Sequence, residues 1–160
     1  MTMNALKLAN SNPYAICYLK GNNTDPKLKG TVELFPWSTG SIVKLEILGL
    51  PVENINNFFG FHIHKEGICD VNKNFETAGP HFDEEKQNKH PNHTGDLPMI
   101  YSNNGYAFML YYTNRFRPDD VVGKSIIIHK MRDDMVSQPS GNSGERIACG
   151  VIIKRRWMFA

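Results

Sequence analysis

The six histidines of this chain are gathered in two segments and are absent from the rest of the sequence. Five of them fall between positions 62 and 93, and the sixth is His129. Imidazole is the commonest metal-binding side chain in proteins. The clustering therefore predicts metal binding, and the spacing within each cluster indicates which kind of site is formed.

The first cluster is the pair His62 and His64. Successive side chains of a β-strand point to opposite faces of the sheet, so both imidazoles lie on one face. Phe61 and Ile63 then pack on the other face. This arrangement would supply two ligands to one metal ion. Taken alone, a pair of this kind is more often exposed or hydrogen-bonded than bound to a metal.

The second cluster combines two imidazoles with a carboxylate at intervals of three residues: His90, His93 and Asp96. Nitrogen and oxygen donors at this density suit a tetrahedral zinc site that needs a fourth ligand. His81 lies between the two clusters. Its deprotonated ring has two nitrogens, so it could bind one metal ion through each and join the two sites. The alternative is a polar, solvated loop in which the histidines are incidental.

His129 ends the apolar run of residues 125–129 and begins a segment rich in Asp, Ser, Gly and Pro. From there it could reach the first cluster as a further ligand, or it could be an ordinary hydrogen-bonded histidine at a strand end. Four imidazole nitrogens near one plane suit copper(II), and imidazole also binds copper(I). An ion held in this way could change its oxidation state without losing its ligands.

The segments that must position these ligands have the pattern of short antiparallel strands. Val43, Leu45 and Ile47 alternate with Lys44 and Glu46, which is the period of a strand with one buried face and one solvated face. Strands are predicted over residues 15–19, 31–35, 42–48, 59–64, 106–112, 125–129 and 147–153. The stretches between residues 64 and 106 and between 129 and 146 are long loops that carry or border the histidines, and loops of this length are usually functional or disordered.

Length and composition limit the class of protein. The chain has 160 residues, of which 41% are apolar and 21% charged, and its formal net charge is +2. These values are typical of one soluble globular domain. We expect a flexible N-terminal arm over residues 1–13 and a single domain over residues 14–160.

The same features exclude several functions and locations. Positive charges are too few and too scattered to predict nucleic-acid binding. No apolar run is long enough to span a membrane. The start of the chain lacks an apolar secretory signal, so we expect a cytoplasmic protein as written, or a processed form of an exported or surface protein.

Several motifs resemble those of the copper,zinc superoxide dismutase family, and they occur in that family's order. They are Gly60-Phe61-His62-Ile63-His64, Ala78-Gly79-Pro80-His81-Phe82, His93-Thr94-Gly95-Asp96-Leu97, and residues 123–129 and 141–152. The resemblance extends over about residues 16–153. The continuation of the third motif into Pro98 makes the chain most similar to bacterial members.

The resemblance implies an all-β fold, a Greek-key β-sandwich or flattened barrel of about eight antiparallel strands with two long functional loops, for which this family is itself a standard example. It also implies copper and zinc as cofactors. The implied copper ligands are His62, His64, His81 and His129. The implied zinc ligands are His81, His90, His93 and Asp96.

Four further residues acquire roles only through this resemblance. Asp133 would accept hydrogen bonds from one copper ligand and one zinc ligand. Arg146 would attract an anion beside the copper, and a disulfide would join Cys69 to Cys149. The spacing from His90 to His93 is shorter than in the common eukaryotic pattern, so the zinc-binding loop is contracted.

The implied activity is that of a superoxide dismutase, which converts the superoxide anion to dioxygen and hydrogen peroxide as copper alternates between copper(II) and copper(I). His81 and Arg146 would be the catalytic residues. A non-catalytic copper-binding or copper-buffering protein on the same scaffold would share His62, His64 and His129 but could dispense with Arg146 and Asp133. A structural domain would need no metals. The sequence leaves both a monomer and a homodimer open.

Overall fold

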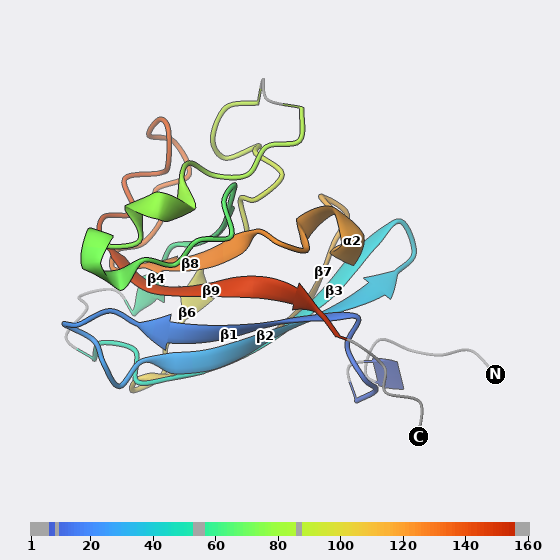
Figure 1. The fold of residues 1–160 in the computed structure, drawn as a ribbon, viewed down its shortest axis with the longest axis horizontal. Helices are drawn as coiled ribbons and strands as arrows, with labels where there is room; N and C mark the ends of the chain where they lie inside the picture. Colours follow the sequence, from blue (N-terminus) through green and yellow to red (C-terminus); the bar gives the residue numbers. More distant parts are fainter. Residues whose placement is uncertain (1–6, 9, 53–56, 86–87, 156–160) are drawn as a thin grey trace.

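The computed structural model describes residues 7–8, 10–52, 57–85 and 88–155, and within them the fold is all-β. Seven antiparallel strands form one sheet in the order β5-β8-β9-β1-β2-β3-β7, and β4 pairs with β6 in a second, smaller sheet (Figure 1). The strands are β1 (Ala15–Gly21), β2 (Lys29–Trp37), β3 (Gly40–Leu48), β4 (Phe58–Phe59), β5 (Phe61–His64), β6 (Ile100–Tyr101), β7 (Tyr106–Thr113), β8 (Ser125–His129) and β9 (Arg146–Lys154).

The helical elements are short and lie outside the sheet. They include the 3-10 helices η1 (Val71–Lys73) and η2 (Glu76–Ala78), and the α-helix α2 (Pro118–Val121). None of the helices in the described part of the chain has the length and apolar character needed to cross a membrane.

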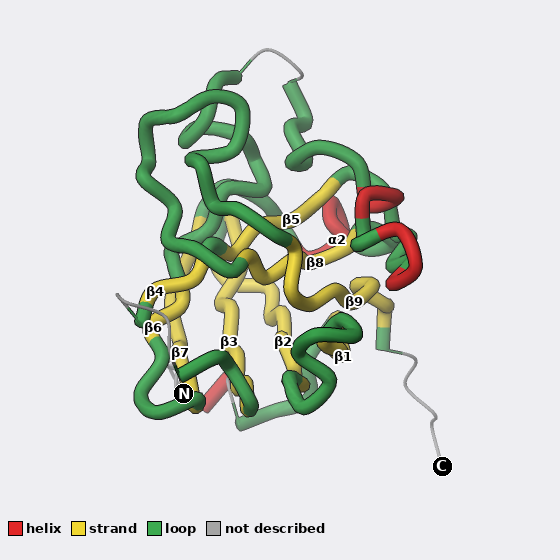
Figure 2. The backbone as a smooth tube through the Cα atoms, turned by 90° about the vertical axis from the view of Figure 1, so that its left-hand side faces the viewer, coloured by secondary structure: helices red, strands yellow, loops and turns green. Residues whose placement is uncertain are grey.

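The order of the strands is that of a Greek-key fold. The chain passes from one end of the large sheet to the other between β3 and β5, and again between β7 and β8. The sheet curls, so that its β5 end and its β7 end face each other across the interior (Figure 2). The prediction of an all-β, Greek-key architecture is confirmed.

The alternating pattern that predicted the third strand is reproduced in β3. Val43, Leu45 and Ile47 are fully buried, whereas Glu46 is exposed. Lys44 lies opposite Glu33 of β2, and its Nζ is 2.9 Å from that carboxylate. The period of two thus separates a core face from a solvated face, as expected for a sheet that covers one side of a core.

The core lies inside the curl of the sheet and orients the strands that carry histidines. Phe61 and Ile63 of β5 pack there together with Ile126 and Ile128 of β8, and all four side chains are fully buried. Because neighbouring side chains of a strand alternate, burial of Phe61 and Ile63 turns the histidines of β5 to the opposite face. The apolar residues therefore determine where the histidines point.

The predicted strand over residues 59–64 is divided into two strands by Gly60. A Cβ atom at this position would lie 2.8 Å from the side chain of Ser143 and 3.2 Å from that of His129, so only glycine fits. The Gly60 N–H donates to Met131 O, and the His129 N–H donates to Gly60 O. The break between β4 and β5 thus follows from close contact with the segment around His129.

The two long loops lie on the same side of the molecule, beside β5 and β8 (Figures 1 and 2). We call residues 65–99 the first loop and residues 130–145 the second loop. Most of the expected N-terminal arm over residues 1–13 lies outside the described residues. Within the described part, Leu8 is buried in a small cluster with Phe35 and Ile42.

Candidate metal centre

The first loop is attached to the free edge of β5. This strand pairs with β8 on one side only, because it is the last strand of the large sheet. On its other side, the Ile63 N–H donates to Gly95 O and the Phe82 N–H donates to Ile63 O, at 2.9 and 2.8 Å. A Cβ atom on Gly95 would lie 2.3 Å from Ile63 O, so glycine permits this close approach. The contacts place His81 and Asp96 beside the histidines of β5.

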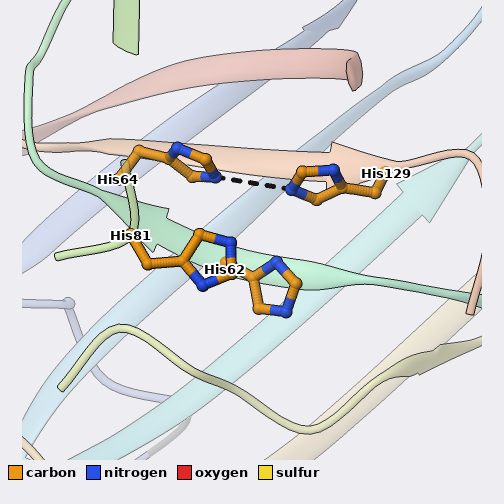
Figure 3. A group of neighbouring side chains, drawn as sticks. All are labelled: His62, His64, His81 and His129. Carbon is orange, nitrogen blue, oxygen red and sulfur yellow. Dashed lines mark hydrogen bonds between the residues drawn. The ribbon is translucent and has the colours of Figure 1, made fainter. Parts of the chain in front are cut away.

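Four histidines from three parts of the chain form the first ligand set, which we call the copper set: His62, His64, His81 and His129 (Figure 3). Each offers one ring nitrogen, and these four atoms all lie within 4.8 Å of one another. All four residues are buried. The set combines β5, the first loop and the last residue of β8, so residues 67 positions apart in the sequence meet here.

A second set, which we call the zinc set, contains His81, His90, His93 and Asp96. Its four ligand atoms also lie within 4.8 Å of one another. His81 belongs to both sets, and its Nδ1 lies 2.7 Å from Asp96 Oδ1. Three nitrogens and one carboxylate oxygen are the donors of a closed tetrahedral zinc site.

Hydrogen bonds at the outer nitrogens of His64 and His129 determine which atoms face the centre. His64 Nδ1 lies 2.8 Å from Gly79 O, and His129 Nδ1 lies 3.2 Å from Gly144 O. A carbonyl oxygen only accepts, so the proton of each neutral ring is assigned to Nδ1. The two Nε2 atoms lie 3.4 Å apart, and the dashed line in Figure 3 joins them. With both protons on Nδ1, each Nε2 atom turns a lone pair toward the other. Two lone pairs in this position form a stable arrangement when a cation lies between them.

Asp133 of the second loop orients one histidine from each set. Its Oδ2 accepts from His62 Nε2 and its Oδ1 accepts from His90 Nε2, both at 2.8 Å. Each ring therefore turns its Nδ1 lone pair toward its own set. Burial alone would raise the pKa of Asp133, but the hydrogen bonds from His62, the Met135 N–H and His90 outweigh it and lower the pKa to about 2. The carboxylate stays charged and able to accept from both rings.

Unpartnered buried nitrogens test whether the residues fit metal ions. His62 Nδ1, His81 Nε2, His90 Nδ1 and His93 Nδ1 are all buried and have no hydrogen-bond partner. The last two lie 3.1 Å from Asp96 Oδ2, but without the geometry of a hydrogen bond. Buried polar atoms are nearly always satisfied, and these four belong to the two ligand sets. The donor sets thus fit copper and zinc.

The charge states of these residues also suit metal binding. Burial lowers the pKa of His81 to about 4, and burial and the neighbouring histidines lower the pKa values of His64 and His129 well below 6.5. Burial would raise the pKa of Asp96, but its hydrogen bond with His81 and the nearby imidazoles lower it. Neutral imidazole and ionised carboxylate are the forms that bind metals.

Arg146, the first residue of β9, lies beside the copper set. Its Nη1 donates to Phe75 O at 2.8 Å and its Nη2 donates to Gly79 O at 3.0 Å. Gly79 O also accepts from His64, so one carbonyl joins the guanidinium to a copper-set residue. Glu76 Oε2 lies 3.5 Å from Nη2. A surface pocket is lined by Arg146, His64, His81 and His129 together with Glu76.

A disulfide joins Cys69 in the first loop to Cys149 in β9, across 80 positions of sequence. The pairing expected from the family resemblance is confirmed. Phe75 and Ala78 pack beside Cys149 and Ile127 in a small apolar cluster. The disulfide and this cluster hold the segment whose carbonyls bind Arg146 against β9.

Comparison with known proteins identifies the family. The family model described as copper/zinc superoxide dismutase matches residues 28–152, most of the chain. The chain belongs to the copper/zinc superoxide dismutase family. A Cu-Zn superoxide dismutase of Deinococcus radiodurans is 35% identical over 144 residues, which cover 78% of this chain and 77% of that protein. Superoxide dismutase 2 of Aquifex aeolicus is 33% identical, with 81% and 82% covered.

A solved structure supports the family assignment at the level of the fold. The crystal structure of a double mutant of a SOD-like protein from Bacillus subtilis matches with a TM-score of 0.72 at 26% identity. The match covers 86% of this chain and 96% of that one. The prediction that this chain is most similar to bacterial superoxide dismutases is confirmed, since the relatives described above are bacterial.

Sequence reasoning identified both ligand sets but missed several contacts that support them. The carbonyl of Gly79 and the side chain of Arg115, which donates to two carbonyls of the zinc-binding segment, had no signature in the sequence. Glu76 beside Arg146 was also missed. Such contacts join residues far apart in the chain, so no local motif reveals them.

Proposed function

We propose that this protein is a superoxide dismutase that converts superoxide to dioxygen and hydrogen peroxide. The observation that carries the proposal is that His81 belongs to both of two complete ligand sets, at a pocket that Arg146 also lines. Bound copper would supply a one-electron couple, and bound zinc, held by the set that shares His81, would supply a fixed positive charge.

Arg146 is the proposed binding site for the superoxide anion. Its guanidinium is held by two carbonyls, and its side chain retains 15% of its exposure, so it is both fixed and accessible. A fixed cation in a pocket attracts a small anion and raises its local concentration. Its position also orients the anion toward the copper set without reorganisation during turnover.

His81 is the proposed proton donor to the product. Asp96 holds its Nδ1 on the zinc side, and the ring lines the pocket. A proton carried at Nε2 would therefore be delivered inside the pocket, where the anion held by Arg146 receives it. Peroxide needs two protons, of which this ring would deliver one and water the other.

The test compares three variants of the protein loaded with copper and zinc. His129→Ala removes one copper-set nitrogen and should abolish dismutation while leaving the fold intact. Arg146→Ala should lower kcat/KM about ten- to a hundred-fold, because steering is lost. Arg117→Ala is the control and should retain full activity. In the wild type, the Arg117 guanidinium donates to Ser38 O, which does not line the pocket. Superoxide consumption measured after pulse radiolysis gives the rates, and full activity of His129→Ala would overturn the proposal.

The alternative is a copper-binding protein without catalysis. Such a protein would need the four histidines, but it would not need a guanidinium anchored by two carbonyls beside them. The anchored Arg146 favours the enzyme. If the wild-type protein contains stoichiometric copper and zinc but consumes no superoxide, the non-catalytic alternative is correct.

A further inference from the structure

Arg115 reaches the zinc set from a part of the chain that supplies no ligand. It lies between β7 and α2, and its exposed side chain extends to residues 90–93. Its Nη1 donates to His93 O at 2.8 Å and its Nη2 donates to Pro91 O at 3.0 Å. One guanidinium thus holds two carbonyls of the short segment that begins with His90 and ends with His93.

The two ends of this segment are held by different partners. At the first end, Gln138 of the second loop donates to His90 O at 2.7 Å and accepts from the His90 N–H at 3.1 Å. At the other end, Arg115 holds Pro91 and His93. Residues 90–93 belong to no strand, so sheet hydrogen bonds do not fix the two imidazoles that the segment carries. Side chains supply constraints instead. Gln138 and Arg115 hold the backbone carbonyls of the segment, Asp133 holds the His90 ring, and the Asp96 carboxylate accepts from the His93 N–H at 2.9 Å.

Arginine is suited to this position in a way that lysine is not. The guanidinium is planar and presents its N–H groups in a rigid fork, so it can bind two carbonyls at once. A lysine ammonium is a point donor on a flexible stem. The two acceptor carbonyls belong to Pro91 and His93, which flank Asn92. To bind both at once, the side chain needs the forked donor geometry of arginine, and a positive charge alone is not sufficient.

We propose that Arg115 is a positioning residue that determines the zinc affinity by holding residues 90–93 in the ligating conformation. A ligand that binds only one conformation has its affinity reduced by the fraction of protein in that conformation. Without Arg115, the segment loses both contacts with the guanidinium, and the backbone of His93 keeps only its contacts with Asp96 among those described, so the ligating fraction falls. The proposal rests on the zinc set and not on the proposed dismutation.

The test replaces Arg115→Gln and measures zinc binding without turnover. The metal-free protein is titrated with zinc in competition with a chromophoric chelator. We expect the zinc dissociation constant to rise about 10–100-fold, the usual effect of removing a residue that orients a ligand. Cobalt(II) bound in place of zinc should show weaker and shifted visible bands, because the tetrahedral arrangement is loosened. Arg115→Lys should give an intermediate affinity.

Arg117→Gln is the matched control. It makes the same substitution two residues further along the chain, where the side chain is also exposed and donates to Ser38 O at 3.2 Å. It should leave zinc affinity and the cobalt spectrum unchanged. Thermal unfolding of the metal-free variants separates positioning from general stability, since an exposed arginine contributes little to folding.

Two results would overturn the proposal. One is a zinc affinity and a cobalt spectrum for Arg115→Gln equal to those of the wild type. The other is a parallel loss of zinc affinity, copper affinity and metal-free unfolding temperature, which would make Arg115 a general structural contact. An inactive wild-type protein with normal zinc binding would contradict the proposed dismutation and leave this proposal standing.

Discussion

Asp133 joins the two ligand sets without belonging to either of them. Its oxygens accept from His62 and His90, so one carboxylate fixes the ring direction in both sets. At the scale of single residues, the site therefore depends on groups that do not ligate a metal but hydrogen-bond to the residues that do. Gly79 O acts in the same way on His64 and Arg146. Metal affinity and anion binding should respond to these residues as well as to the ligands.

Replacement of Asp133 by asparagine should weaken binding at both sets. The amide keeps one acceptor oxygen and gains a donor, so His62 or His90 loses its partner and is free to turn. We expect copper and zinc dissociation constants to rise about 10–100-fold, measured by chelator competition. Asp134→Asn is the control, because the exposed Asp134 carboxylate accepts hydrogen bonds from residues 136 and 137 of its own loop and touches neither ligand set within the described residues. Equal effects of the two variants would contradict the prediction.

Replacement of Glu76 by glutamine should strengthen anion binding in the pocket. The Glu76 carboxylate lies 3.5 Å from Arg146 Nη2 and is 71% exposed, so it opposes the positive field and is screened by water. We expect azide, used as a probe anion, to bind the copper-loaded protein about two- to five-fold more tightly at low ionic strength. The difference should shrink as salt is added. Azide titration followed by visible absorption measures both.

Glu145→Gln provides the matched control for that experiment. Glu145 precedes Arg146 in the sequence and is similarly exposed at 72%, but its carboxylate lies 3.3 Å from Lys130. The same charge is removed in both variants. An equal gain in azide affinity would show that net charge, rather than the contact of Glu76 with Arg146, determines the effect.

At the scale of elements, the first loop is attached to the sheet by three kinds of contact. Backbone hydrogen bonds attach it to the edge of β5, the disulfide attaches it to β9, and Arg146 of β9 donates to two of its carbonyls. The loop is thus held along both β5 and β9. The metal ligands it carries are positioned by the sheet rather than by regular structure within the loop.

Removal of the disulfide should destabilise the protein more than it disturbs the ligands. A cross-link between Cys69 and Cys149 closes 80 positions, for which the chain-entropy model gives about 4–5 kcal/mol. The double variant Cys69→Ser, Cys149→Ser should lose roughly this much unfolding free energy in urea, measured on the metal-free protein. Reduction of the wild type should reproduce the loss. An unchanged urea midpoint in both experiments would contradict the prediction.

At the scale of the whole molecule, the curled sheet buries its apolar face and leaves the metal centre on the outside. Phe61, Ile63, Ile126 and Ile128 are fully buried on the inner face, and the histidines of β5 lie on the outer face beneath the two loops. The histidines are nevertheless buried, because the loops cover them. Without metals, the molecule therefore encloses a group of imidazoles, and burial lowers the pKa values of three of them, His64, His81 and His129.

Stability of the metal-free protein should fall with decreasing pH over a defined range. The folded pKa values of His64, His81 and His129 lie below 6.5, so below that pH the unfolded chain binds protons that the folded chain does not. Unfolding is then favoured, and stability is full above pH 6.5 and lost progressively toward pH 4. Thermal unfolding at a series of pH values measures this. The metal-loaded protein should resist acid to a lower pH, and a constant metal-free unfolding temperature from pH 7 to 4 would contradict the prediction.

The sequence predicted those features that depend on short patterns. The alternation around Val43, Leu45 and Ile47 predicted β3, and the histidine spacing predicted metal binding, while the family resemblance of the motifs predicted the membership of both ligand sets. It did not predict the break at Gly60 or the pairing of β4 with β6, because these depend on contacts between distant segments. Arg115 was missed for the same reason. Its role depends on two carbonyls, which every residue possesses and no sequence pattern marks.

The shared carbonyl of Gly79 links two properties that an enzyme would otherwise adjust separately. It accepts from His64 of the copper set and from Arg146, the residue that we propose binds the superoxide anion. Any substitution that shifts this one peptide unit therefore moves both His64 and Arg146. It should change the copper affinity and the anion affinity together. Variation within this short stretch is therefore expected to be correlated, with gains in one property accompanied by changes in the other.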